Sequence, residues 1–297
     1  MMMCKKIIVT ILVLFLLTAC GGSKEGDTNT ANQNNSSPAV TDNSKKEEKT
    51  PKFEEITVID NDYMTMKFTG LNPNGTWGYT LKANIENKSD VNLLIGMNNT
   101  SVDGVMCDPF WATSVAAGKK MNCDISWSKS QLESSGLSGI NNLQFVLHVS
   151  NDDTWDNLFE EKCSLTIDAG CAAPKEVSYS GFNEIDVVDN DSLKFRVIGI
   201  DENGVMGYTL HVLIENGTND YVTVGWDNVS VNGYMCDPFW ATSVSPNCKS
   251  YTDISWAKTQ LEENGISDIE NVEFDLRMSS DATWTTLFEG NYTIDIK

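Results

Sequence analysis

The stretch SVDGVMCDPFWATSV, residues 101–115, recurs almost letter for letter as SVNGYMCDPFWATSV, residues 230–244. Each begins with Asp-Gly or Asn-Gly between apolar residues, the strongest short-range signal for a β-hairpin. Working outward from this stretch, residues 53–168 align with residues 182–297 without a gap, at an offset of 129 residues and with close to half of the positions identical. This pattern indicates a tandem duplication, and each copy is long enough for a core of its own.

The pattern within each copy is typical of β structure. The runs LQFVLHVS (143–150) and VEFDLRMS (272–279) alternate apolar and polar residues, which predicts half-buried strands. NPNG (72–75) and DENG (201–204) read as hairpin turns in which Gly supplies positive φ. Only residues 128–136 and 257–265 look helical, each ending at a glycine. We therefore predict an all-β protein with two tandem immunoglobulin-like β-sandwich domains, each with one short helix.

The N-terminus has the features of a secretory signal. Lys5 and Lys6 precede the apolar run IIVTILVLFLL, which ends in small residues. The run is shorter than the roughly 20 residues that span a bilayer. The tetrapeptide LTAC, residues 17–20, resembles the lipobox of bacterial lipoproteins, which implies that Cys20 receives lipid and becomes the mature N-terminus. The alternative is an ordinary signal peptide with an incidental cysteine.

The expected organisation follows from these signals. Residues 20–51 are rich in Asn, Ser, Thr and Lys and poor in apolar residues, so we expect a disordered tether. The predicted segments are a lipoprotein signal (1–19), the tether (20–51), repeat 1 (52–168), a linker (169–181) and repeat 2 (182–297). The expected location is the cell membrane, with the lipid-anchored chain facing the extracytoplasmic side.

A family resemblance rests on VSVNGYMCDPFWATSV (229–244) followed by DISWAKTQLEENGISDIENVEFDLRMSSDATW (253–284). This succession resembles the immunoglobulin-like, telokin-like domains of uncharacterised Gram-positive surface lipoproteins. The resemblance covers most of both repeats. It implies a fold and a surface location, and no established activity.

Strand parity divides the repeated stretch into two faces. If it is a strand, Cys107, Trp111 and Val115 share one face, and Asp108 and Phe110 share the other. The face with Cys, Trp and Val is predicted to fill the core, together with Trp127 and, in repeat 2, Trp240 and Trp256. The candidate ligand-facing residues are therefore Phe110, Phe239, Asp108 and Asp237.

Six cysteines remain after Cys4 in the signal and Cys20 are set aside, and an even number in a secreted chain suggests disulfides. The preferred pairing joins nearest neighbours: Cys107 with Cys123, Cys163 with Cys171, and Cys236 with Cys248. One observation opposes it, because Cys248 aligns with Lys119 and not with Cys123. Four residues of strand are about 13 Å, beyond the reach of a disulfide. Zinc is the rival use, but no Cys-x-x-Cys pair accompanies these cysteines.

The sequence gives little support for an enzyme activity. His148 and His211 are the two histidines, and neither recurs in the other copy. The motifs of serine hydrolases, phosphate-binding loops and zinc proteases are missing. The DND turns, 60–62 and 189–191, offer oxygen donors for calcium, but without the glycine and distal glutamate of an EF-hand they read as Asx turns. We expect no enzyme activity, cofactor or metal.

The acidic balance limits the partners. The formal charge of −21 becomes −23 when Lys5 and Lys6 leave with the signal, and such a surface repels nucleic acid and anionic lipid. Three roles remain: a binding or adhesion module for an extracellular glycan, peptide or protein; a structural spacer or accessory subunit of an envelope complex; and a carboxylate-dependent hydrolase. The binding module is the leading hypothesis, with the membrane reached through the N-terminal lipid.

Overall fold

The computed structural model describes residues 53–296, and the expected signal, Cys20 and tether lie outside this range. Residues 51–297 group into one compact unit. Repeat 1 contains β1 (Ile56–Asp60), β2 (Met64–Gly75), β3 (Gly78–Asn87), β4 (Leu93–Val102), β5 (Val105–Met106), β6 (Ala112–Val115), β7 (Lys120–Trp127), α1 (Lys129–Ser134), β8 (Asn142–Asn151) and β9 (Asn157–Thr166). Repeat 2 repeats this order with β10 (Ile185–Asp189), β11 (Leu193–Gly204), β12 (Gly207–Asn216), β13 (Val222–Val231), β14 (Tyr234–Met235), β15 (Ala241–Val244), β16 (Lys249–Trp256), α2 (Lys258–Glu263), β17 (Asn271–Ser280) and β18 (Thr286–Asp295).

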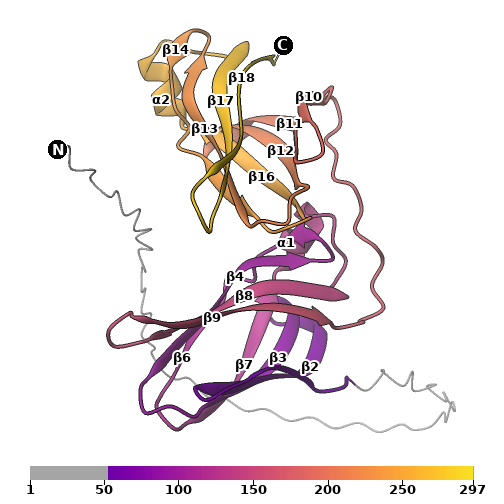
Figure 1. The fold of residues 1–297 in the computed structure, drawn as a ribbon. Coiled ribbons are helices and arrows are strands. Elements are labelled where there is room, and N and C mark those ends of the chain that lie inside the picture. Colours follow the sequence, from indigo (N-terminus) through magenta and orange to yellow (C-terminus); the bar gives the residue numbers. More distant parts are fainter. Residues whose placement is uncertain (1–52, 297) are drawn as a thin grey trace, which may run out of the picture. The chain divides into compact units, whose positions relative to one another are not determined.

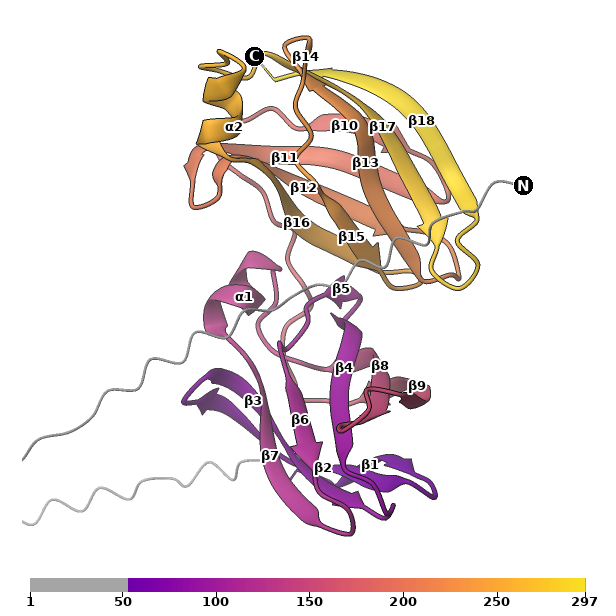
Figure 2. The ribbon, with the colours of Figure 1, turned by 90° about the vertical axis from the view of Figure 1, so that its left-hand side faces the viewer.

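Each repeat is a sandwich of two antiparallel sheets (Figures 1 and 2). In repeat 1 one sheet has the order β1-β2-β3-β7, and the other has β4-β8-β9 with β5 and β6 beside β4. Repeat 2 has the matching sheets β10-β11-β12-β16 and β13-β17-β18, with β14 and β15 beside β13. Figure 2 shows α2 at one end of the repeat 2 sandwich. The all-β prediction is therefore confirmed.

The cores arise from the alternation seen in the sequence. Leu143, Phe145 and Leu147 on β8 are fully buried and face the opposite sheet, because successive side chains of a strand point to opposite faces. The indoles of Trp127 and Trp256 are also fully buried. The prediction that they are structural is confirmed.

The turns match the sequence in one place and differ in another. Asp103 and Gly104 both have positive φ, 50° and 80°, as a type I′ hairpin turn requires. The predicted turn at NPNG is wrong, because β2 continues through it to Gly75, which pairs with Gly78 across an irregular register. The reversal instead occurs at Thr76 and Trp77, and the same shift is present in repeat 2.

The linker lies against both repeats. Its Lys175 N–H donates to the carbonyl of Gly136 at 2.8 Å, and Val177 N–H donates to the Tyr251 hydroxyl at 3.3 Å. Tyr179 stacks on His211, with ring centroids 4.0 Å apart. A Cβ on Gly199 would come within 2.5 Å of the Tyr179 ring, so the absence of a side chain there makes room for the ring.

The two repeats also touch directly. Val105 of β5 pairs in parallel with Lys249 of β16, and Lys249 N–H donates to the Gly104 carbonyl at 2.9 Å. Ser101 receives a 3.4 Å hydrogen bond from the Cys248 thiol. This single backbone pairing joins the second sheet of repeat 1 to the first sheet of repeat 2.

Candidate functional site

The repeated stretch is not one continuous strand. Residues 107–111 form a loop between β5 and β6, and residues 236–240 form the equivalent loop in repeat 2; we call these the Phe loops. Cys107 and Val115 are buried and Trp111 packs on the core. The predicted inward face is therefore correct, although a strand carries it only from Ala112 onward.

Four hydrogen bonds hold the Phe loop of repeat 1. The Trp127 indole N–H donates to the Cys107 carbonyl at 2.7 Å, and the Gln131 side-chain amide of α1 donates to the Asp108 carbonyl. Cys107 N–H donates to the Thr100 carbonyl at 2.9 Å, and Thr100 N–H donates to Asp108 Oδ1 at 2.7 Å. The loop is thereby tied to both sheets and to the helix.

Repeat 2 reproduces this support with one change. Trp256 and Gln260 donate to the carbonyls of Cys236 and Asp237 at 2.8 and 2.7 Å. The Asp237 carboxylate, however, accepts from Phe239 N–H at 2.8 Å and so closes an Asx turn within the loop.

These bonds give the two aspartates a positioning role. The carboxylates of Asp108 and Asp237 each accept a backbone N–H of the structure that presents the Phe side chain. Burial raises the pKa of Asp108, and the backbone hydrogen bond from Thr100 opposes this shift. Contact between either carboxylate and a ligand remains a prediction.

The Phe side chains are held out of the fold. Phe110 and Phe239 are each 92% exposed, and their φ angles are 45° and 51°. For a bulky residue this left-handed backbone costs about 1–2 kcal/mol and persists only where the surroundings impose it. Two equivalent loops therefore impose the same strained presentation of an aromatic ring.

A second pair of exposed aromatics was missed at the sequence level. Trp155 and Trp284 lie in the β8–β9 and β17–β18 turns, largely exposed and with φ of 64° and 58°. Their backbone N–H groups donate to the carbonyls of Asn151 and Ser280, both at 2.8 Å. The signal was the Thr-Trp pair that recurs in both copies, because an indole kept at a polar turn by both repeats is not explained by the core.

All six described cysteines are unpaired thiols, so the predicted disulfides are absent from the described chain. Trp127, at the end of β7, binds the backbone of Cys107, whereas Cys123 lies four residues earlier on that strand, about 13 Å away. In repeat 2 the indole of Trp256 likewise donates to the carbonyl of Cys236. Cys248 lies eight residues before Trp256, a distance of about 26 Å along the strand.

The third pairing fails for the same reason. Cys163 pairs across the sheet with Phe145, whereas Cys171 N–H donates to the side chain of Asn141 at 2.8 Å. Asn141 lies four residues before Phe145, so roughly 13 Å of strand separates the two cysteines.

The remaining polar candidates have structural partners. Asn61 and Asn190 in the DND turns accept backbone N–H bonds two and three residues ahead, as Asx turns do. His148 lies 2.9 Å from Glu160, and His211 lies 2.7 Å from Asp253. Among residues 53–296 no cluster of His, Cys, Asp or Glu is arranged to hold a metal. Nor is any helix in this range long and apolar enough to cross a membrane.

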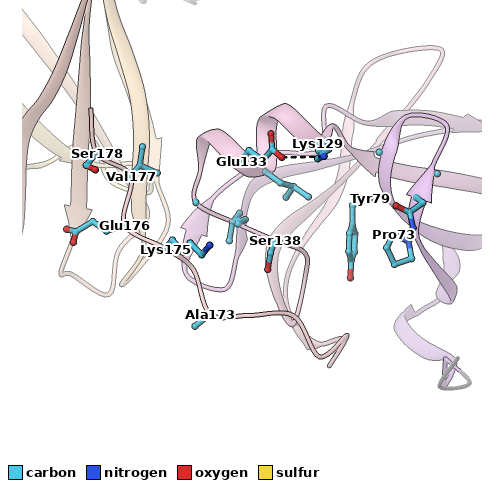
Figure 3. Close-up of a pocket in the computed structure, with 16 residues that line it drawn as sticks. Pro73, Tyr79, Lys129, Glu133, Ser138, Ala173, Lys175, Glu176, Val177 and Ser178 are labelled. Atoms are coloured by element: carbon cyan, nitrogen blue, oxygen red, sulfur yellow. Dashed lines mark ion pairs between the residues drawn. The ribbon is translucent and has the colours of Figure 1, made fainter. Parts of the chain in front are cut away.

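A hollow of about 940 Å³ lies between the β2–β3 turn, α1 and the linker (Figure 3). Its wall includes Tyr79 and the ion pair of Lys129 with Glu133, 3.7 Å apart. The Tyr79 hydroxyl lies 3.5 Å from the Cys171 thiol and is thus already engaged by the linker. A hollow of about 450 Å³ lies at the equivalent place in repeat 2, beside Tyr208, Lys258 and Leu261.

The chain is similar to solved structures at low sequence identity. No family model matches it, and no curated protein matches it. Among solved structures, the Salmonella enterica SafA pilin in complex with the SafB chaperone matches with a TM-score of 0.21 and 11% identity, covering 72% of this chain and 89% of that one. A protein of unknown function from Porphyromonas gingivalis W83 matches with a TM-score of 0.19 and 10% identity, covering 73% and 90%.

Proposed function

We propose that this chain is a cell-surface binding module, anchored by lipid at Cys20, that contacts an extracellular glycan, peptide or protein through the Phe loops. The observation that carries the proposal is the pair Phe110 and Phe239, each 92% exposed at a left-handed φ in equivalent loops. Backbone strain that two copies retain at an exposed aromatic is typical of a contact site.

The support around each ring is also that of a binding site. A contact residue gains affinity when its backbone is already ordered, because less conformational entropy is then lost on binding. The indole and glutamine bonds to the loop carbonyls provide that order in both repeats. Two sites on one chain can engage a repetitive ligand together, which strengthens binding without any new contact.

The role proposed is recognition and not catalysis. The two histidines each face a single carboxylate, and they occupy different positions in the two repeats. The alternative is a spacer or accessory subunit of an envelope complex, for which the direct backbone pairing between the repeats is the supporting observation. That alternative assigns no role to the exposed rings.

The test is a binding screen of the wild-type protein against immobilised glycans and bacterial and host surface proteins. A ligand found in the screen is then measured with the Phe110→Ala, Phe239→Ala double variant. We expect at least a tenfold loss of affinity, because aromatic anchors dominate the binding energy of such contacts. Each single variant keeps one site, so it should lose mainly the extra affinity that comes from binding at two sites together.

The matched control is Trp155→Ala with Trp284→Ala, which removes exposed aromatics from the other turns. Binding that survives the Phe variant and is lost in the Trp variant would move the site to those turns. Binding that survives both would contradict an aromatic contact. The anchor has a test of its own: incorporation of an alkyne-labelled fatty acid should disappear in Cys20→Ser.

A further inference from the structure

The hairpin tip of each repeat meets a different environment. We call residues 103–106 the tip of repeat 1 and residues 232–235 the tip of repeat 2. In repeat 1, Val105 is fully buried and Met106 packs against the core of repeat 2. In repeat 2, Tyr234 and Met235 at the same positions are 55% and 67% exposed. The tip that is covered within the chain is thus matched by an apolar tip that is uncovered.

The surface that covers the first tip is the turn before β16, residues 245–248, which we call the base of repeat 2. Ser245 donates through its hydroxyl to the Asn99 carbonyl at 2.9 Å, and its N–H contacts the Met106 sulfur at 3.3 Å. The Cys248 thiol donates to Ser101 at 3.4 Å. Contact between one tip and one base is therefore an interface that this fold already makes.

The equivalent base of repeat 1, residues 116–119, keeps the backbone of that interface. Glu86 pairs with Lys120 in repeat 1 in the same register in which Glu215 pairs with Lys249 in repeat 2. The N–H of Lys120 therefore occupies the position from which Lys249 donates to Gly104.

The tip of repeat 2 and the base of repeat 1 differ in two side chains from the tip and base that are in contact. These two differences introduce opposite charges. At the position of Cys248 the base of repeat 1 carries Lys119, which is exposed. At the position of Ser101 the tip side of repeat 2 carries Ser230, whose hydroxyl donates to Glu273 at 3.3 Å. Glu273 replaces Gln144 of repeat 1. A lysine on one side would thus face a glutamate on the other.

We propose that the tip of repeat 2 docks on the base of repeat 1 of a second copy of this chain, so that copies join head to tail. Tyr234 and Met235 supply the apolar contact, and Lys119 pairs with Glu273 in place of the Cys248–Ser101 contact. The two surfaces are different patches of the molecule, so the contact is heterologous and can repeat from copy to copy. The apolar tip, the retained register and the opposite charges together favour a second copy over an unrelated partner.

The first test is the weight-average mass of residues 51–297, a compact unit with both cores complete, measured by sedimentation over a range of concentrations. We expect the mass to rise with concentration past that of a dimer. Tyr234→Ser with Met235→Ser should weaken the association at least tenfold. The matched control is Val205→Ser with Met206→Ser, which removes a still more exposed apolar pair from another turn and should change nothing.

The second test separates a head-to-tail contact from a symmetric one. Lys119→Glu should block the base by repulsion from Glu273, and the Tyr234→Ser, Met235→Ser variant has a blocked tip. Each alone is expected to stay monomeric, whereas an equimolar mixture should form one-to-one pairs and stop there. Adding Glu273→Lys to the Lys119→Glu variant should restore association, because the two charges are then opposite again.

Three results would overturn the proposal: a monomer at all concentrations up to about 1 mM, association that survives loss of the tip, or blocked variants that fail to pair when mixed. The Phe110→Ala, Phe239→Ala variant should associate as the wild type does. Failure of the ligand-binding proposal and failure of this one are therefore distinguishable.

Discussion

Phe110 and Phe239 have a positive φ at which any side chain with a Cβ lowers the stability of the fold. At a φ near 50° the Cβ crowds the neighbouring carbonyl, and a ring that is 92% exposed recovers little of this cost by burial. Their value to the protein therefore lies outside its own stability, in contrast to Trp127 and Trp256, whose burial contributes to the core.

Comparison of glycine with alanine at position 110 measures this strain. Phe110→Gly should be more stable than Phe110→Ala by about 1 kcal/mol, because only glycine adopts the left-handed region freely. Urea unfolding of the two variants gives the difference. At Ser114, an exposed strand position, the order should reverse, since glycine costs entropy in a strand. Equal stability of the two variants at position 110 would contradict the strain.

The unpaired cysteines give a second prediction at this scale. With no reductant present, residues 51–297 unfolded in guanidinium should show six reactive thiols with a colorimetric disulfide reagent, and the folded protein should react slowly because four of them are buried. A count of four or fewer would mean that disulfides form, against the distances set by the strand register.

The same thiols make stability depend on alkaline pH. Burial raises the pKa of Cys107, Cys123 and Cys163 from 9.0 to about 11. Between pH 9 and 11 the unfolded chain therefore binds fewer protons than the folded one, and the free energy of unfolding falls as pH rises. It is unaffected by these groups below pH 9. Tyr208, with a pKa raised by burial to about 12, acts in the same direction at higher pH.

Urea midpoints measured from pH 8 to 11 in the presence of a reductant check this sign. Replacing the three cysteines by alanine should make the decline shallower, whatever it does to the stability at pH 8. A decline of equal slope in the triple variant would assign the effect to other groups.

At the scale of elements, the helix acts as a brace for the Phe loop. The α1 helix has six residues and buries Leu132, while its Gln131 reaches across to the loop carbonyl; α2 does the same through Gln260. So short a helix is not stable by itself. The sandwich orders the helix, and the helix in turn fixes the loop.

Gln131→Ala with Gln260→Ala tests this brace. Removal of one hydrogen bond per loop should cost about 0.5–1.5 kcal/mol in stability for each repeat and should weaken binding of any ligand found in the screen severalfold. The contact residues themselves are unchanged. Lys129→Ala, which alters an exposed ion pair on α1, is the control. Unchanged binding in the glutamine variant would show that the loop orders itself.

Sequence reasoning predicted what depends on local pattern and missed what depends on register. The alternation at Leu143–Val149 and the type I′ turn at Asp103-Gly104 could be read directly, because neighbouring residues determine them. The reversal at Thr76 and Trp77 could not, since the pairing of β2 with β3 contains two irregularities, each of which shifts the register by one residue. The cysteine pairing failed because it required distances between strands that the linear spacing does not contain.

The candidate site divides in the same way. Phe110 and Phe239 were found because parity turned them away from Trp111 and Trp240. The left-handed backbone and the bonds from Trp127 and Gln131 depend on contacts across the sandwich. Trp155 was missed because a tryptophan is by default assigned to the core.

On the scale of the whole molecule, the two repeats are packed against each other and are not joined by the linker alone. Cys248 is buried at the junction, against Ser101. Its counterpart Lys119 is exposed, so the sequence difference between the copies marks where the covered base lies. Lys162 also reaches across, 4.5 Å from the centre of the Tyr221 ring, in a cation–π contact.

Cys248→Lys should therefore separate the repeats. A charge without a partner is costly to bury, so the junction should open rather than enclose it. We expect a larger radius of gyration by small-angle scattering and two unfolding transitions in place of one. Cys248→Ser keeps a donor to Ser101 and should retain the wild-type behaviour. One transition with an unchanged radius in the lysine variant would contradict a stabilising junction.

The docked linker has a consequence for the resistance of the protein to proteases. A protease must draw several residues of substrate into an extended form, so a segment held by its own backbone bonds resists cleavage even without secondary structure. Trypsin cleaves after lysine, so Lys175 is a potential cleavage site, but its N–H donates to the Gly136 carbonyl. The two backbones are so close that a Cβ at Gly136 would lie 2.1 Å from the carbonyl oxygen of Lys175. The junction that looks most vulnerable in the sequence is thereby shielded, and the two repeats should stay joined under proteolysis.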